Sequence, residues 1–318
     1  GLIAPAVALG KMTSIGGQAL MEGIMMVGPF KTVAAFAGKD GTITTEEMSM
    51  TPLRMKYPIL GKPFIRGIFN MIDTLRLGMK ALERSADKAT EGEEEPESKF
   101  DRWITEKLGD KITPVITGIG TVLGLALSVV LFLYLPILAF NGIKLLVGTS
   151  IEPVRSLVEG VFRIIIFIGY LCLVSLLPDI KRVFMYHGAE HKTIFCYEAE
   201  LPLTVENVRK QRRFHPRCGT SFLVILIVLG MIIGFFIPFT NPVLRTLCKI
   251  LCLPITVCFG YELIKLCGRH NNLLTRIISA PGLWVQRITT KEPDDKMIET
   301  AIRAMEEVIP LGGEDIIG

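Results

Sequence analysis

Residues 112–143 read ITPVITGIGTVLGLALSVVLFLYLPILAFNGI and contain no charged side chain. A helix needs about 20 apolar residues to cross the hydrocarbon core of a bilayer, so this run is long enough to span one. Half of the 318 residues are hydrophobic, and they are concentrated between Ile112 and Leu266. This clustering excludes an ordinary soluble protein and predicts an integral membrane protein.

Three further apolar segments raise the expected number of transmembrane helices to about four. They are Ile164–Pro178, Thr220–Thr240 and Leu247–Leu263. The last segment is the weakest, because it carries Lys249 and contains Pro254, which should kink a helix. The fold class predicted from this pattern is a mainly α-helical polytopic membrane protein with a small α+β cytoplasmic N-terminal domain.

Lysine and arginine residues are distributed unevenly between the apolar runs. Eight lie within 179–219, whereas two lie within 144–160 and one within 241–246. Loops rich in these residues stay in the cytoplasm, so the 179–219 loop is expected there. Four spans would put both termini on the same side. The net charge of the chain is only +4, and no specific nucleic acid is predicted as a partner.

Composition divides the chain into four parts. These are a cytoplasmic N-terminal domain (1–90), an acidic linker (91–99), a four-span membrane domain (100–270), and an interfacial segment followed by an amphipathic helix (271–318). Within the first part, 32–48 predicts a β-hairpin that turns at 39–41, and apolar spacing predicts an amphipathic helix over Pro63–Asp87. Residues 100–112 predict a helix at the membrane surface, and the C-terminal helix is expected to pack against the N-terminal domain.

The cytoplasmic loop contains YHGAEHKTIFCYE at 186–198. His187 and His191 are four residues apart and share one face of a helix, so both imidazoles can reach one metal ion. Glu190 lies beside that face and is expected to act as a general base. The resulting order, H-x-x-E-H, is the one found in inverted zinc peptidases. His215 and Cys218 follow in the same loop as further ligands, and this mixture of donors suits zinc.

Two alternatives stand beside this metal hypothesis. The histidines can instead cap helices or contact lipid phosphates. A peptidase also needs a further glutamate ligand well downstream. Glu198, Glu200 and Glu206 lie close by, and at the expected distance the chain offers only Glu262, at the end of a predicted span. The sequence therefore favours a metal site over a protease.

The segment SIGGQALMEGIMMVGP at 14–29 is the second candidate region. Its Gly16-Gly17 pair predicts a turn, and a helical turn after it would place Gln18 and Glu22 on one face. No G-K-[ST] follows, which excludes a phosphate loop. Glu22 is interpreted either as a helix cap or as an auxiliary catalytic carboxylate.

A basic run, RKQRRFHPR, occupies 209–217. Its side chains Arg209, Lys210, Arg212 and Arg213 are expected to bind lipid or a partner. Each basic side chain near an anionic bilayer contributes about 1 kcal/mol of attraction, so headgroup contact is the favoured interpretation. Contact with an RNA backbone is the alternative.

Four motifs in this chain resemble those of the DUF1385 family. They are GGQALMEGIMMVGP, YHGAEHKTIFCYE, HPRCGTSFL and PGLWVQRITTKEPDD, in that order between residues 16 and 295. The chain matches the family pattern at Glu22, His187, Glu190, His191, His215 and Cys218. The resemblance implies a multi-pass protein of the bacterial inner membrane, in a family described as metal-dependent enzymes on the strength of the same histidine motif.

Two functions follow as hypotheses. The first is a membrane-embedded, zinc-dependent enzyme, hydrolytic in its most concrete form, with its site on the cytoplasmic face. The second is a non-enzymatic accessory factor in membrane-protein biogenesis, whose basic run docks a translocon or ribosome.

Overall fold

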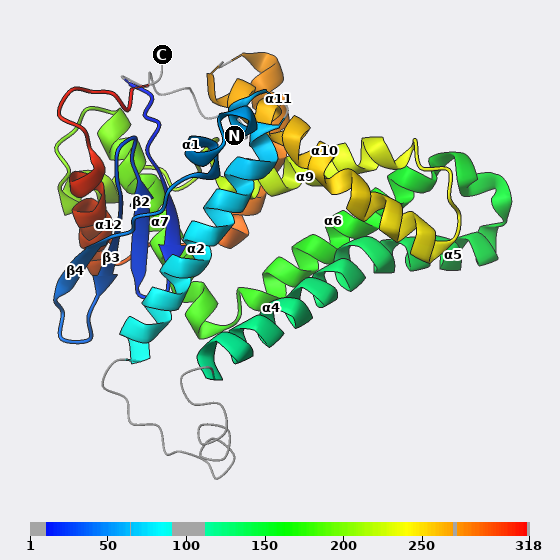
Figure 1. Ribbon diagram of the computed structural model, residues 1–318, viewed down its shortest axis with the longest axis horizontal. Coiled ribbons are helices and arrows are strands. Elements are labelled where there is room, and N and C mark those ends of the chain that lie inside the picture. Colours follow the sequence, from blue (N-terminus) through cyan, green and yellow to red (C-terminus); the bar gives the residue numbers. More distant parts are fainter. Residues whose placement is uncertain (1–10, 64, 91–111, 270–271, 317–318) are drawn as a thin grey trace, which may run out of the picture. The chain divides into compact units, whose positions relative to one another are not determined.

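The computed structural model describes residues 11–63, 65–90, 112–269 and 272–316 (Figure 1). The chain forms two compact units. The first comprises Gly1–Ala89, Tyr170–Leu226 and Pro254–Gly318, and the second comprises Thr90–Gly169 and Ile227–Leu253. The predicted acidic linker at 91–99, and all but the last residue of the surface helix predicted over 100–112, lie outside the described residues.

A four-stranded antiparallel sheet in the order β1-β2-β3-β4 forms part of the first unit. Its strands are β1 (Gly16–Leu20), β2 (Gly23–Val27), β3 (Thr32–Ala37) and β4 (Ile43–Glu47). The hairpin predicted over 32–48 is therefore confirmed as β3–β4. Its turn is stabilised by Asp40, whose carboxylate accepts hydrogen bonds from the backbone and the hydroxyl of Thr42.

The segment at 14–29 was predicted as a turn followed by a helical turn, and this prediction is wrong. It forms the β1–β2 hairpin, with Glu22 in the connecting turn at a φ of +50°. Strand β2 is buried on both faces, which gives it a continuous apolar run instead of the alternation that marks a half-exposed strand. That pattern does not distinguish a buried strand from a short helix.

Helices cover both faces of the sheet. Helix α2 (Arg66–Thr90) packs Ala81 with β-sheet residues that include Leu20 and Phe36. On the other face, α7 (Pro178–Glu198) and α12 (Asp295–Val308) share a core with residues of β2 and β3. The amphipathic helix predicted over Pro63–Asp87 and the C-terminal helix are both confirmed, and α12 packs against the N-terminal sheet as expected.

The 179–219 segment is not an extended loop. Helix α7 takes up most of it, followed by the short α8 (Val205–Arg209). Tyr186, Ala189 and Cys196 of α7 belong to the core that also contains α12. The sequence between the apolar runs therefore folds as part of a compact unit with the N-terminal sheet.

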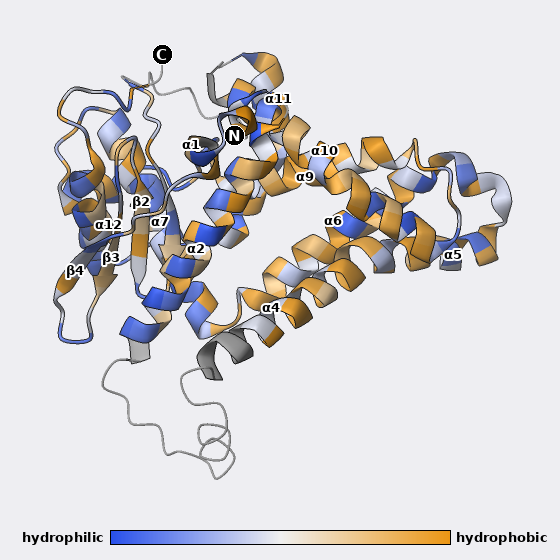
Figure 2. Cartoon of the chain, in the orientation of Figure 1, coloured by the Kyte–Doolittle hydropathy of each residue, from blue (hydrophilic) through white to orange (hydrophobic). Residues whose placement is uncertain are grey.

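Besides the short helical segments α1 (Leu53–Lys56), Pro58–Gly61 and Thr149–Val154, the remaining helices are largely apolar (Figure 2). They are α4 (Ile112–Val129), the π-helical turn Val130–Tyr134, α5 (Leu135–Val147), α6 (Arg155–Val174), α9 (Gly219–Gly234), α10 (Pro242–Arg269) and α11 (Leu273–Thr289). Among the described residues, three stretches are long and apolar enough to cross a bilayer: Gly118–Val147, Thr149–Val174 and Pro242–Cys267. These helices support membrane insertion.

The expected number of four spans is not confirmed. The apolar stretch predicted over Thr220–Thr240 forms only the shorter helix α9, of 16 residues. The fourth segment is longer than predicted, because α10 runs from Pro242 to Arg269 and continues through Pro254. The segment expected to lie on the membrane forms α11, which leaves Leu273, Ile277 and Trp284 exposed.

Gly188 is required where α7 meets the segment after α11. A Cβ atom at this position would stand 2.0 Å from the carbonyl oxygen of Lys291, whose backbone N–H donates to Phe184 O. Gly188→Ala should therefore lower the free energy of unfolding by about 2–3 kcal/mol, although alanine favours helices. Chemical denaturation in detergent measures the effect. Gly16→Ala is the control, because its Cβ would meet nothing within 4 Å, and an equal loss in both variants would contradict the prediction.

Candidate metal centre on helix α7

Three potential metal ligands converge beside α7. His187 and His191 share one face of this helix, and Cys218 directly precedes α9. One ligand atom from each residue lies within 4.8 Å of the other two. His187 Nε2 is 3.2 Å from Cys218 Sγ, and the two imidazole centroids are 4.4 Å apart. The structure thus brings together two of the three predicted histidine ligands and the predicted cysteine.

Backbone carbonyl groups orient both imidazoles. His187 Nδ1 lies 2.9 Å from the carbonyl oxygen of Thr289, and His191 Nδ1 lies 2.5 Å from that of Arg213. A carbonyl oxygen only accepts hydrogen bonds, so each Nδ1 carries the proton. Each Nε2 then has a free lone pair, the arrangement by which proteins prepare histidine for a metal. Burial lowers the pKa of His191.

The pKa of the Cys218 thiol is lowered by its surroundings. Burial alone would raise the pKa of its thiol, but the neighbouring His191 and hydrogen bonds from Thr220 outweigh it and lower the pKa. Thr220 contributes its hydroxyl at 3.2 Å and its backbone N–H at 3.5 Å from the sulfur. The start of α9 adds the partial positive charge of a helix N-terminus.

Glu190 is buried beside the same cluster. Burial raises the pKa of its carboxyl to about 7, while the neighbouring His187 and a hydrogen bond from the Gly17 N–H act in the opposite direction. A Cβ on Gly17 would stand 2.9 Å from two Glu190 carbon atoms, so only glycine permits this approach of β1. A carboxyl with such a pKa can accept and release a proton near neutral pH.

His215 occupies a neighbouring position outside the three-ligand group. Its ring centroid is 5.6 Å from that of His191, but its Nε2 lies 3.7 Å from Glu198 Oε2. Glu198 is fully buried, and it accepts hydrogen bonds from the Thr13 N–H and from the Arg217 guanidinium. His215 is thus oriented toward an ion pair behind the ligands.

Gln286 of α11 connects this layer to the rest of the unit. Its side-chain oxygen accepts from the His215 N–H at 2.7 Å, and its nitrogen donates to the His215 carbonyl at 2.8 Å. Sequence reasoning missed Gln286, and it considered Glu198 only as a possible metal ligand and Gly17 only as part of a turn. The sequence signal for Gln286 was an isolated amide in a largely apolar segment. Such a signal does not show which groups the amide contacts.

Glu22 has partners of its own. Its carboxylate accepts two hydrogen bonds from the Arg182 guanidinium and one from Tyr186 Oη at 3.2 Å. Both partners lie on α7, so this network fixes the β1–β2 turn against the helix that carries the histidines. The catalytic role assigned to Glu22 stays a prediction.

The basic run is largely compensated by internal ion pairs. Arg209 pairs with Asp295, Lys210 with Glu206, and Arg213 with Glu292 at 2.8 Å. Arg212 also has an interaction partner. These pairs reduce the excess charge that the run would present to lipid or to a partner.

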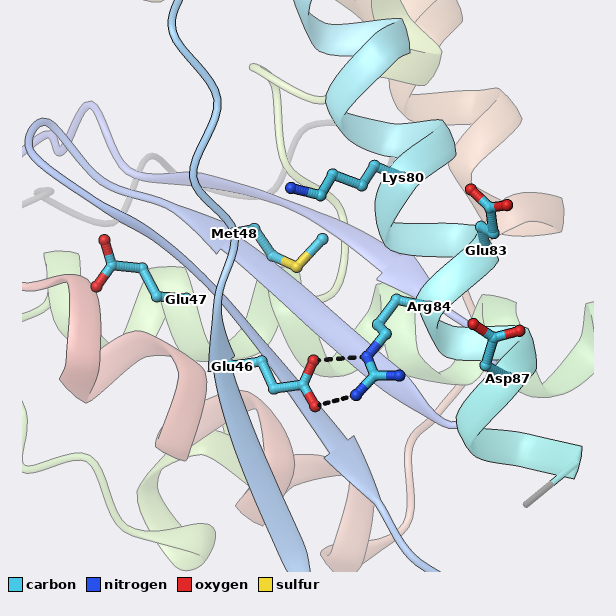
Figure 3. Close-up of a pocket in the computed structure, with 7 residues that line it drawn as sticks. All are labelled: Glu46, Glu47, Met48, Lys80, Glu83, Arg84 and Asp87. Atoms are coloured by element: carbon cyan, nitrogen blue, oxygen red, sulfur yellow. Dashed lines mark hydrogen bonds and ion pairs between the residues drawn. The ribbon is translucent and has the colours of Figure 1, made fainter.

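An open pocket lies elsewhere in the first unit, between β4 and α2 (Figure 3). Charged side chains line it, and Glu46 accepts two hydrogen bonds from Arg84 at 2.8 and 2.9 Å. Arg84 and then Lys88 lower the pKa of Glu46 to about 2. None of the predicted site residues lines this pocket.

Comparison with known proteins now places the chain in a family. The model of the family "Protein of unknown function (DUF1385)" matches residues 62–311. The chain belongs to the DUF1385 family. It is also 34% identical over 304 residues to "Uncharacterized protein YqhQ" of Bacillus subtilis (strain 168), covering 93% of this chain and 92% of that protein. No solved structure matches the chain.

The Glu198–Arg217 pair yields a prediction about stability. Glu198→Gln should lower the free energy of unfolding at pH 7 by about 3 kcal/mol, because it leaves the Arg217 charge without its buried partner. Although burial would raise the pKa of Glu198, His215 and Arg217 lower it below the ordinary 4.5. Its contribution is therefore present above pH 4.5 and lost as the pH falls through the folded-state pKa.

Denaturation of wild type and variant at pH 7 and at pH 3.5 measures this linkage, with the difference expected to shrink at the lower pH. Glu307→Gln, which alters an exposed ion pair with Lys31, serves as the control and should leave stability unchanged. A difference between wild type and Glu198→Gln that is independent of pH would contradict the assignment.

Proposed function

We propose that this protein is a membrane-anchored, metal-dependent hydrolase whose metal ligands are His187, His191 and Cys218. One observation carries the proposal: three ligand atoms converge within 4.8 Å while the opposite nitrogen of each imidazole is held by a carbonyl oxygen. A histidine that only caps a helix or contacts a lipid headgroup does not need a fixed tautomer. Here both rings have a fixed tautomer, and both lie beside the Cys218 thiol.

The donor set fits zinc best. Imidazole nitrogen and thiolate sulfur are its preferred donors, and bond lengths of about 2.0–2.3 Å place tetrahedral ligands about 3.5 Å apart. The 3.2 Å between His187 Nε2 and Cys218 Sγ is close to that spacing. Three protein ligands also leave one tetrahedral position for water or substrate, which is characteristic of catalytic sites.

A zinc ion would supply a Lewis acid and lower the pKa of a water molecule to about 7. The chain supplies the proton transfer. Glu190 accepts a hydrogen bond from the Gly17 N–H, and we assign it the proton transfer: it takes a proton from an attacking water and returns it to a leaving group. The carbonyl oxygens of Thr289 and Arg213 hold Nδ1 of both imidazoles, which leaves Nε2 of each ring to face the metal.

The arrangement of the first unit supports a location on the cytoplasmic face of the bacterial inner membrane. Three stretches of chain, separated by apolar helices, fold together in this unit. This favours a topology in which the polar parts of the three stretches share one side of a bilayer and the chain crosses and returns between them. Both termini would then share that side, and the excess of lysine and arginine in 179–219 favours the cytoplasm.

The accessory-factor hypothesis gains less from the structure. It assigned the docking of a translocon or ribosome to the basic run. Ion pairs with Asp295, Glu206 and Glu292 already engage three of those side chains. The metal-dependent enzyme is therefore the function that the geometry favours.

Metal analysis tests the ligand set directly. The full chain, purified in detergent without chelator and supplied with zinc, should retain about one zinc per molecule by mass spectrometry, as expected for one three-ligand site. His187→Ala/His191→Ala and Cys218→Ser should each lose it, whereas His215→Gln should keep it. Cys172→Ser is the matched control, because this exposed thiol lies on α6. Wild type without stoichiometric metal would exclude the proposal.

Glu190→Gln tests the assigned proton transfer separately. The variant should bind zinc like wild type but hydrolyse p-nitrophenyl acetate or bis-p-nitrophenyl phosphate about 10²–10⁴-fold more slowly, the usual contribution of a general base. Glu206→Gln removes an exposed carboxylate of α8 and should leave the rate unchanged. Full activity in Glu190→Gln with zinc bound would show that Glu190 is not the base.

A further inference from the structure

The second unit carries a group of charged side chains that the proposed metal chemistry does not use. Its described residues contain five basic and two acidic side chains within otherwise apolar helices. Five of the seven are buried: Arg155, Glu159, Arg163, Arg245 and Lys249. Charged residues in membrane-spanning segments are costly and mark functional sites by default.

Glu159 lies at the centre of this group and is 1% exposed. Its carboxylate accepts hydrogen bonds from Arg245 Nε at 2.8 and 3.1 Å, and from the Lys249 ammonium. Arg155 Nε is also 3.2 Å away. Three positively charged side chains therefore share one carboxylate as their ion-pair partner.

Arg163 adds a fourth buried positive charge. Within the described residues, no carboxylate lies within 4.0 Å of it. Its Nε donates instead to the carbonyl oxygen of Phe132 at 2.7 Å, in the π-helical turn Val130–Tyr134. A π-helical turn shifts the regular bonding pattern of a helix and is frequent at functional sites.

The remaining pair in this unit does not restore neutrality. Lys144 binds Glu152, which also lies 3.7 Å from Arg155. This acidic residue is balanced by Lys144, so the described part of the unit keeps an excess of three positive charges, five basic against two acidic. Buried charges without partners are strongly destabilising, and an anion from outside the chain would offset them.

Unmade hydrogen bonds point to the same ligand chemistry. Arg155 Nε and Nη1 and the Thr246 hydroxyl are buried in this unit without a hydrogen bond, and the two Arg155 atoms have only ion-pair contacts, at 3.2 Å with Glu159 and 3.7 Å with Glu152. The Arg155 side chain is itself only 7% exposed. All three groups can donate, and an oxyanion offers only acceptors. Buried polar atoms left unpaired in a native structure call for an explanation such as a missing ligand or ion.

Position along the helices indicates where such a ligand would sit. Arg155 is the first residue of α6, and Arg245 is the fourth residue of α10. Helix N-termini favour anions through the helix dipole, although Asn241 already accepts hydrogen bonds from the first N–H groups of α10. Arg163 lies about 12 Å further along α6, at a rise of about 1.5 Å per residue. The charges thus begin at the ends of apolar helices, the depth at which phospholipid phosphates occur.

We propose that the cluster of Arg155, Arg163, Arg245 and Lys249 around Glu159 binds a phosphate oxyanion. Guanidinium groups match phosphate oxygens with several N–H donors, and the surrounding helices are apolar. This site is independent of the proposed metal centre, and neither requires the other. A phospholipid headgroup and a free phosphate both supply the oxyanion, and they are separated by experiment.

Native mass spectrometry of the full chain in a neutral detergent tests the proposal. The probes are phosphatidylglycerol, diacylglycerol with the same acyl chains but no phosphate, and inorganic phosphate. We expect phosphatidylglycerol to bind at least about ten-fold more tightly than diacylglycerol, the effect of one good charge-assisted hydrogen bond. Binding of inorganic phosphate with equal affinity would identify the free anion as the source. Binding of neither phosphate-bearing probe above diacylglycerol would overturn the proposal.

Two variants separate a binding site from a structural ion-pair network. Arg155→Gln should weaken phosphatidylglycerol binding about ten-fold with the fold retained, since two of its nitrogen atoms make no hydrogen bond in the chain. Glu159→Gln removes the central negative charge and should bind at least as tightly as wild type. Lys31→Gln, which loses one charge in the first unit, is the matched control. Unchanged binding in folded Arg155→Gln would refute the assignment.

Discussion

The close contact of α7 with its neighbours is the constraint on which the first unit depends. Two glycines permit it from opposite directions. Gly17 of β1 lets the Glu190 side chain lie against the strand, and Gly188 lets the carbonyl of Lys291 approach the helix. A β-carbon at either position would separate elements that together hold the core of α7, α12 and the sheet. The same contacts bring a buried carboxyl beside two imidazoles and a thiol.

The candidate metal centre is organised by backbone groups more than by side chains. Carbonyl oxygens of Thr289 and Arg213 fix the histidine tautomers, and the N–H groups of Gly17 and Thr220 face Glu190 and Cys218. A backbone carbonyl or N–H group keeps its position as long as the helix or strand that contains it does not move. Ligand geometry therefore depends on the packing of α7, α9, α11 and β1, and Gln286 reinforces that packing by holding both backbone groups of His215.

The two units use charge in different ways. In the first unit, the acidic and basic side chains around the site are paired, as in Glu198 with Arg217 and Glu22 with Arg182. In the second unit, basic side chains outnumber acidic ones among the described residues. Gly230 and Gly234 contribute there: Arg163 Nη1 and the Ser156 hydroxyl lie 3.1 and 2.9 Å from where their β-carbons would be. This G-x-x-x-G spacing makes room for polar side chains as well as for a neighbouring helix.

The sequence alone determined those helices and strands whose residue pattern reflects local structure, such as an apolar run, a turn or a regular spacing of apolar residues. Long uncharged runs predict apolar helices of membrane-spanning length, the turn at 39–41 predicts the β3–β4 hairpin, and apolar spacing predicts α2 and α12. It also proposed His187, His191 and Cys218 as candidate ligands, and the structure brings these three side chains together. Only the tertiary structure decided that β1–β2 is a hairpin, since burial on both faces removes the alternation that identifies a strand. Only it separated His215 from the three-ligand group and paired the basic run with acids distant in sequence, because such contacts depend on packing between elements.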